Sequence, residues 1–116
     1  MKLRYFHMFS GSDNYLVLPL NSVAIENLDM VRGCAAGKDL ISSMHFDKTR
    51  EAEFRVYSKK EHRFLDAVWT APANFQVHMI QAFEDPDDPN IIHLDTLVAG
   101  SGDAISEYYY DVSSQN

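Results

Sequence analysis

Cysteine is almost absent: Cys34 is the single thiol among 116 residues, so no disulfide can form within the chain. A chain of this length buries roughly two thirds of the surface that its unfolded form exposes, which suffices for one core without cross-links. We therefore expect a single domain over residues 1–116, with a frayed tail at 113–116. Cysteine usage of this kind fits a reducing compartment, and Cys34 is expected to be a small buried or half-buried thiol.

A secretory leader and a membrane span are not predicted. The N-terminal run MKLRYFHMFS is interrupted by His7 and Ser10, and no small-residue cleavage site follows. No apolar run approaches the ~20 residues that a bilayer-spanning helix needs. We therefore expect a soluble protein that is made in the cytoplasm and has no membrane partner.

Basic residues are missing from the C-terminal half. The chain carries a net charge of -7, and residues 64–116 contain no lysine or arginine. This distribution disfavours direct binding of nucleic acid by that half, because the phosphate backbone requires positive charge. Two interpretations remain open: a solubilising acidic face, or a surface that meets a basic partner, including the N-terminal part of a second copy.

Motifs for nucleotide binding and nucleophilic catalysis are also missing. The stretch RGCAAGKD, residues 32–39, has only three residues between Gly33 and Gly37, and Asp39 replaces the hydroxyl residue of a phosphate-binding loop. We interpret it as a connecting loop. No serine lies in a Gly-x-Ser-x-Gly elbow, and no histidine can be placed beside Cys34. The sequence therefore predicts no catalytic residue and no cofactor.

Histidine is present five times, but no two histidines have the i, i+4 spacing of a helical metal site. His45-x-Asp47 and His93-x-Asp95 each place two ligand types on one face of a strand. A metal-dependent enzyme that uses His45, His93 and nearby aspartates is therefore kept as an alternative, although no metal site is predicted.

The acidic stretch EDPDDPN, residues 84–90, does not fit a calcium-binding helix–loop–helix. Counted from Asp85, Asn90 stands where that loop needs glycine and Thr96 where it needs glutamate. An adventitious cation held by Asp85, Asp87 and Asp88 remains an alternative. These three side chains are also candidate contacts with a protein partner.

Mostly two-residue periodicity predicts a β-rich α+β fold, a compact antiparallel sheet or barrel of about eight strands with one short helix. Turn residues at 11–14 (GSDN) and 86–90 (PDDPN) predict hairpin links. The expected strands cover 3–9, 15–20, 22–30, 40–47, 53–58, 74–83, 91–99 and 106–112.

The expected helix covers residues 60–70. Phe64, Leu65, Val68 and Trp69 recur at helical spacing there, and Thr70-Ala71-Pro72 ends the pattern. Trp69 is expected in the core.

Three consecutive tyrosines near the C-terminus are candidate interface residues. Side chains alternate between the two faces of a strand, so at least one ring of Tyr108, Tyr109 and Tyr110 must point away from the core. Tyrosine suits interfaces because it combines apolar area with a hydroxyl group.

The order of these pieces resembles short structural proteins of tailed bacteriophages. The matching pieces are RYFHMFSGSDNYLVLPL, EFRVYSKKEHRFLDAVW and DPDDPNIIHLDTLVAGSGDAI. The resemblance implies a virion component of the capsid decoration or cement type, made in the host cytoplasm. It also implies partners: further copies of itself, as a homo-oligomer such as a trimer, and the major capsid protein.

The sequence thus predicts a non-enzymatic structural protein of a virus particle that acts through protein–protein contacts. Many weak contacts in such a shell add up through avidity. The alternative is a small acidic intracellular binding or regulatory module that meets a basic partner.

Overall fold

A computed structural model of the chain describes residues 3–38 and 43–100. The predictions for the strand at 106–112, for Tyr108, Tyr109 and Tyr110, for Asp39 and for the tail at 113–116 lie outside these residues.

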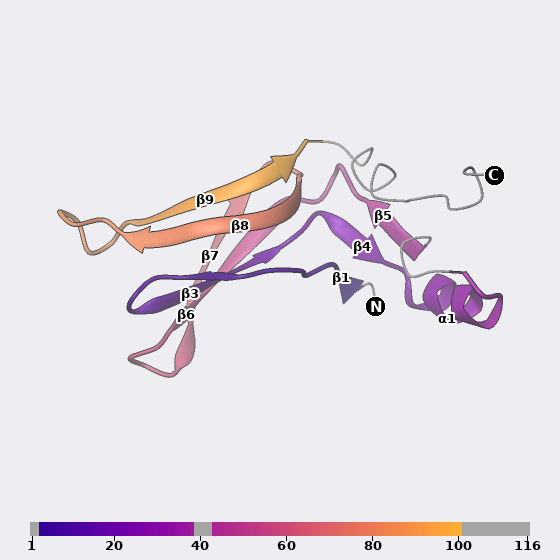
Figure 1. Cartoon of the computed structure of the whole chain (residues 1–116), viewed down its shortest axis with the longest axis horizontal. Helices are drawn as coiled ribbons and strands as arrows, with labels where there is room; N and C mark the ends of the chain where they lie inside the picture. Colours follow the sequence, from indigo (N-terminus) through magenta and orange to yellow (C-terminus); the bar gives the residue numbers. More distant parts are fainter. Residues whose placement is uncertain (1–2, 39–42, 101–116) are drawn as a thin grey trace, which may run out of the picture.

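The described chain forms three antiparallel sheets and one helix in an elongated molecule of 56 × 30 × 24 Å (Figure 1). The first sheet has the order β1-β4-β5, the second β2-β3-β6-β7, and the third is the hairpin β8-β9. The bounds are β1 Leu3–Arg4, β2 Ser10–Gly11, β3 Tyr15–Leu20, β4 Val23–Ile25, α1 Asn27–Ala35, β5 Met44–Phe46, β6 Ala52–Ser58, β7 Arg63–Ala71, β8 Phe75–Glu84 and β9 Ile92–Ala99. The predicted β-rich class with one short helix is confirmed, and within the described residues no sheet closes into a barrel.

Both predicted hairpin turns are present. Residues 12–14 connect β2 to β3, and residues 85–91 connect β8 to β9. Asn14 and Ser12 from the first turn bind Glu84 at the end of β8, so the two turns lie side by side. The bonds run from Ser12 Oγ (2.6 Å), Asn14 N (2.9 Å) and Asn14 Nδ2 (2.7 Å) to the Glu84 carboxylate, and they hold the pKa of Glu84 below its ordinary value.

The predicted helix at 60–70 is wrong. Residues 59–62 form a turn in which His62 has a φ of 53°, and β7 follows. The apparent helical stripe arises because both faces of β7 carry apolar side chains that pair with β6. Phe64 lies edge-on to Tyr57, with ring centroids 5.3 Å apart, and Trp69 is opposite Phe54.

The helix lies instead at α1, where the sequence predicts a strand at 22–30 and a loop at 32–39. Its apolar residues Leu28 and Val31 are exposed, so the amphipathic pattern that would have identified it is weak. The glycine-containing stretch terminates it. Gly37 has a φ of 72°, and the N–H groups of Gly37 and Lys38 bond back to the carbonyls of Cys34 (3.2 Å) and Gly33 (2.8 Å). In the described part of the chain, no helix is both long and apolar enough to cross a membrane.

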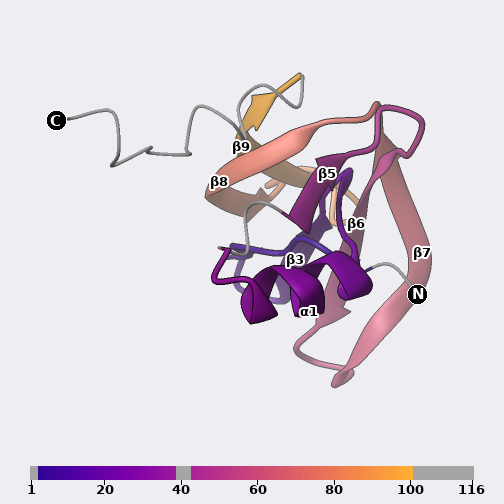
Figure 2. The same ribbon diagram turned by 90° about the vertical axis from the view of Figure 1, so that its right-hand side faces the viewer.

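The main core lies between the four-stranded sheet and the β8-β9 hairpin, which form two layers in Figure 2. Its buried side chains are Val17, Val56, Met79 and Ala82. Trp69, expected in this core, is 47% exposed because it lies on the edge strand β7 of the sheet.

Candidate functional site

Two histidines that are far apart in the sequence lie side by side. The rings of His7 and His78 meet edge to face, with centroids 5.8 Å apart and an interplanar angle of 60°. His7 belongs to the segment between β1 and β2, and His78 belongs to β8. Both side chains are exposed. The fold therefore presents a pair of imidazoles on an accessible surface.

The conformation of β8 around His78 is irregular on both sides. The register between β8 and β9 shifts between Gln76 and His78, and again between Met79 and Gln81. Each shift adds one residue on β8 relative to β9, which is the pattern of a β-bulge; bulges redirect the neighbouring side chains and are common beside active sites. The Thr96 hydroxyl donates to the His78 carbonyl at 3.0 Å and holds this section of backbone.

His7 is supported by an aromatic stack. The ring of Tyr5 lies nearly parallel to His7, with centroids 6.0 Å apart and planes 10° apart. Tyr5 also packs on the buried ring of Phe75, at 5.7 Å between centroids. Burial raises the pKa of the Tyr5 hydroxyl, so the ring is a neutral phenol at neutral pH.

Exposed apolar side chains neighbour both histidines, along the chain for His7 and across the hairpin for His78. Phe6, Met8 and Phe9, which adjoin His7 in sequence, are exposed. Leu97 lies directly opposite His78 across the hairpin and is 53% exposed. Directly opposed residues share a face of a sheet, so Leu97 borders the His78 imidazole. Leu97 therefore adds exposed apolar area beside His78, and Phe6, Met8 and Phe9 add it in the segment that carries His7.

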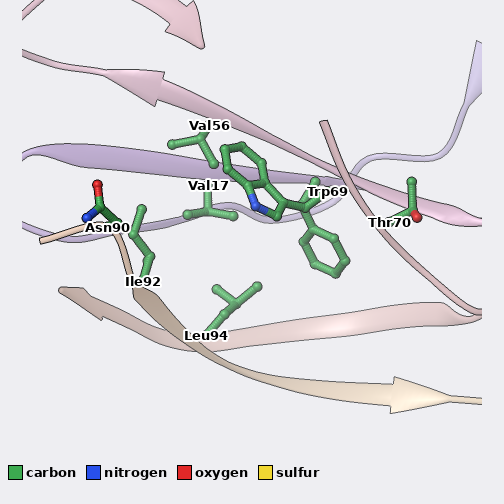
Figure 3. Close-up of a pocket in the computed structure, with 8 residues that line it drawn as sticks. Val17, Val56, Trp69, Thr70, Asn90, Ile92 and Leu94 are labelled. Carbon is green, nitrogen blue, oxygen red and sulfur yellow. The ribbon is translucent and has the colours of Figure 1, made fainter. Parts of the chain in front are cut away.

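A separate apolar cavity of about 280 Å³ opens between the four-stranded sheet and the hairpin. Figure 3 shows the Trp69 indole on one side, and Ile92 and Leu94 on the other. Ile92 and Leu94 project from the hairpin face opposite the one that carries Leu97 and His78, because side chains alternate along a strand. The cavity is therefore not part of the histidine site.

The histidines that the sequence singled out are not brought together. His45 lies in β5 at one end of the long axis, and His93 lies beside the β8-β9 turn at the other end (Figure 1). His45 Nε2 is 3.7 Å from Asp29, and His93 Nε2 is 2.7 Å from Asp85. Within residues 3–38 and 43–100, no group of three or more histidine, cysteine or acidic side chains could hold a metal ion by itself.

The acidic residues of the β8-β9 turn bind their own backbone. The Asp85 carboxylate accepts the N–H groups of Asp87 (2.9 Å) and Asp88 (3.0 Å), and Asp88 accepts that of Asn90. The His93 ring, with these two N–H groups, holds the pKa of Asp85 below its ordinary value. The carboxylates thus stabilise the turn, and their role as partner contacts stays a prediction.

Cys34 is exposed, not buried or half-buried as expected, because it lies in the last turn of α1, which packs little against the sheets.

Sequence reasoning missed the pairing of His7 with His78. The available signal was local: each histidine stands in an aromatic or apolar run, YFHMF and VHM. That pattern is common in strands, and only the long-range packing of the β1–β2 segment on β8 brings the rings together.

Comparison with known proteins identifies relatives. A sequence model of the family described as retinal pigment epithelial membrane protein matches residues 2–116. Torulene dioxygenase of Fusarium fujikuroi is 28% identical over 116 residues, which cover 93% of this chain and 20% of that protein. Carotenoid isomerooxygenase of Galleria mellonella is 28% identical over 80 residues, covering 69% of this chain and 15% of that protein. The chain thus spans about a fifth or less of the length of these relatives.

These matches overturn the predicted function. The resemblance to bacteriophage capsid decoration proteins is wrong, and so are the predicted non-enzymatic role and virion location, because the relatives are carotenoid-metabolising enzymes. The matches also do not support the alternative function, a small acidic intracellular binding or regulatory module. The resemblance rested on the order of strands and turns, which many β-rich folds share, and not on any functional residue. Self-association stays a prediction.

Proposed function

Because this chain belongs to the retinal pigment epithelial membrane protein family, we propose that it forms part of an oxygenase that acts on a carotenoid-like polyene, and that His7 and His78 hold its metal ion. The relatives named torulene dioxygenase and carotenoid isomerooxygenase support the reaction class. The observation that carries the proposal is the His7–His78 ring pair at 5.8 Å.

The two side chains suit a dioxygen-activating metal. Protein chemistry with dioxygen relies on cofactors such as haem, flavin, copper or non-haem iron. Imidazole is a favoured ligand of iron and copper. Among residues 3–38 and 43–100, neither ring has an ion pair or hydrogen bond that would compete for its nitrogens. Iron or copper at this point would supply the activation of dioxygen.

The described residues provide only part of a metal-ligand set. No third histidine, cysteine or carboxylate joins His7 and His78 within residues 3–38 and 43–100. Further ligands would therefore come from protein outside these residues. This agrees with the small share of each relative that the chain covers.

The surroundings suit a hydrocarbon substrate. Exposed apolar side chains occur in the segment that carries His7 (Phe6, Met8 and Phe9) and opposite His78 on the hairpin (Leu97). Binding sites for small molecules are mostly apolar with a few polar groups that fix orientation. In this proposal the apolar residues bind the polyene and exclude water, while His7 and His78 fix the position of the metal ion.

Metal binding by the full 116-residue chain tests the assignment of ligands. Calorimetric titration with cobalt(II), an air-stable substitute for iron(II), should give one ion per chain. His7→Ala and His78→Ala should each abolish this binding. His45→Ala, a change at another exposed histidine, should leave it intact. Equal binding by His7→Ala and the unmodified chain would exclude His7 as a ligand.

The reaction class is tested separately, on the protein at its natural length. Oxygen uptake should accompany loss of the visible absorption of a carotenoid, because oxidative cleavage shortens the conjugated chain. Absorption that fades equally without protein, or no oxygen uptake by metal-loaded protein, would contradict the proposed activity.

A further inference from the structure

The two histidines lack a local element that fixes their separation. His7 lies outside any strand, and His78 lies between two bulges, where the ladder to β9 is interrupted. Their rings touch only edge to face. A site that positions a metal ion requires its ligands to be held by surrounding contacts. Some other group must therefore link the two segments.

Asn21 makes this link. It lies between β3 and β4, and 1% of its surface is exposed. Its side-chain oxygen accepts the backbone N–H of Gln76 at 2.5 Å. Its side-chain nitrogen lies 3.4 Å from the carbonyl of Gln76 and 3.4 Å from the carbonyl of Tyr5. One buried amide thus bonds the backbone two residues before His7 and two residues before His78.

Neighbouring contacts make Asn21 a rigid attachment point. Its backbone carbonyl accepts the Arg4 Nε–H at 3.1 Å. The adjacent residue Ser22 is fully buried and exchanges two bonds with Asn74: its N–H donates to the Asn74 carbonyl, and its hydroxyl accepts the Asn74 N–H, both at 3.1 Å. The side chain of Asn21 therefore cannot move without disturbing the start of β8.

Aromatic ring contacts connect the same two segments, the one that carries His7 and the start of β8. Tyr5, whose carbonyl meets Asn21, stacks on His7, and its ring packs on Phe75, the residue before Gln76. Displacing Tyr5 from β8 would carry the His7 ring away from His78. Loss of the Asn21 amide would therefore be transmitted to the imidazoles.

We propose that Asn21 is a positioning residue that sets the separation of His7 and His78 by bonding the backbone of both segments. Its importance for metal binding rests on the function proposed above, whereas its effect on the two rings does not. The proposal is therefore tested first on metal-free protein.

The test compares Asn21→Leu with the unmodified chain. Leucine has the same number and branching of side-chain heavy atoms, and it removes all three side-chain bonds without opening a cavity. In the unmodified chain, nuclear Overhauser effects should connect the ring protons of His7 and His78. In Asn21→Leu these cross-peaks should disappear. Their persistence at full intensity would overturn the proposal.

Two further variants separate positioning from general stability. Val56→Ala removes buried core volume from β6, outside this group of contacts, and should lower the melting temperature while it preserves the ring cross-peaks. Loss of the cross-peaks in Val56→Ala would show that any destabilisation disperses the rings and would also overturn the proposal. Asn21→Asp keeps the acceptor for Gln76 N–H and loses both donors. It should weaken the cross-peaks, and it provides the test if Asn21→Leu does not fold.

The affinity for cobalt(II) then tests whether the positioning role of Asn21 affects the proposed metal site. Asn21→Leu should bind on the order of tenfold to hundredfold more weakly, which is the usual effect of removing support from metal ligands. Val56→Ala should bind as the unmodified chain does. If the unmodified chain binds no cobalt(II), the proposal that His7 and His78 hold the metal ion in this chain fails, while the ring cross-peaks still decide the role of Asn21. Unchanged affinity in Asn21→Leu would refute its role at the metal site.

Discussion

Gln76 offers a quantitative test of the packing beneath the histidine pair. Its side chain is buried, at 3% exposure, and neither its amide oxygen nor its amide nitrogen has a hydrogen-bond partner among the residues that the structure describes. A buried polar group without a partner costs about 1–3 kcal/mol. Methionine has a similar length and no such requirement, and its flexible chain fills irregular space. Gln76→Met keeps both backbone bonds to Asn21, because these involve only the Gln76 main chain.

We expect Gln76→Met to raise the free energy of unfolding by about 1–3 kcal/mol. This corresponds to a rise of several degrees in melting temperature, at ~4–8 °C per kcal/mol for a domain of 60–100 residues. Urea unfolding followed by the fluorescence of Trp69 measures the change, and the slope with denaturant should stay constant.

The matched control is Gln81→Met, the same substitution on the same strand. Gln81 is exposed and bonds Asp95 at 2.6 Å, so its replacement should change stability by less than about 0.5 kcal/mol. A less stable Gln76→Met would refute the reasoning, because it would show that the carboxamide has a partner in solution.

Two other predictions concern the turns and the helix end. Bonds from Ser12 and Asn14 lower the pKa of Glu84 below its ordinary value. The stability they contribute is therefore present at pH values above the ordinary pKa and is lost as the pH falls through the lower pKa of the folded state. Urea unfolding of Glu84→Gln between pH 3 and 7 should lack this part of the pH dependence; an unchanged pH profile would contradict it. Gly37→Ala should destabilise the end of α1 by about 1 kcal/mol, since φ is 72° there, while Gly100→Ala, with open space around it, should have little effect in thermal melts.

Local signals predicted the hairpins, because their determinants are short-range. Glycine, asparagine and proline restrict the backbone within a few residues, so GSDN and PDDPN identify turns without knowledge of the fold. β3 and β8 followed from apolar runs between such turns, and their predicted positions agree with the structure to within a residue.

The helix was misplaced because two patterns are ambiguous by themselves. Phe64, Leu65, Val68 and Trp69 have helical spacing, but on the edge strand β7 they divide between the two faces. The true helix, α1, exposes Leu28 and Val31 and has no side-chain bond at its N-terminal cap, so its start carries little signal. The Ala-Ala-Gly-Lys sequence at its end was the available indication, since Gly37 terminates the helix.

The functional residues could not be predicted because their association depends on long-range packing. Metal-site spacing rules search for ligands close together in sequence, whereas His7 and His78 meet only when the β1–β2 segment packs on β8. Asn21, which links the two segments, looks in the sequence like an ordinary polar residue after a strand. Its burial and its bond to Gln76 exist only in the folded chain.

The most direct test of the proposed metal centre is a cobalt(II) titration of the full chain with labelled histidine imidazoles, followed by nuclear magnetic resonance. The account predicts that the signals of His7 and His78 broaden together and before those of His45, His62 and His93. Broadening that begins at His45, His62 or His93, or that affects His7 and His78 at different cobalt concentrations, would contradict it.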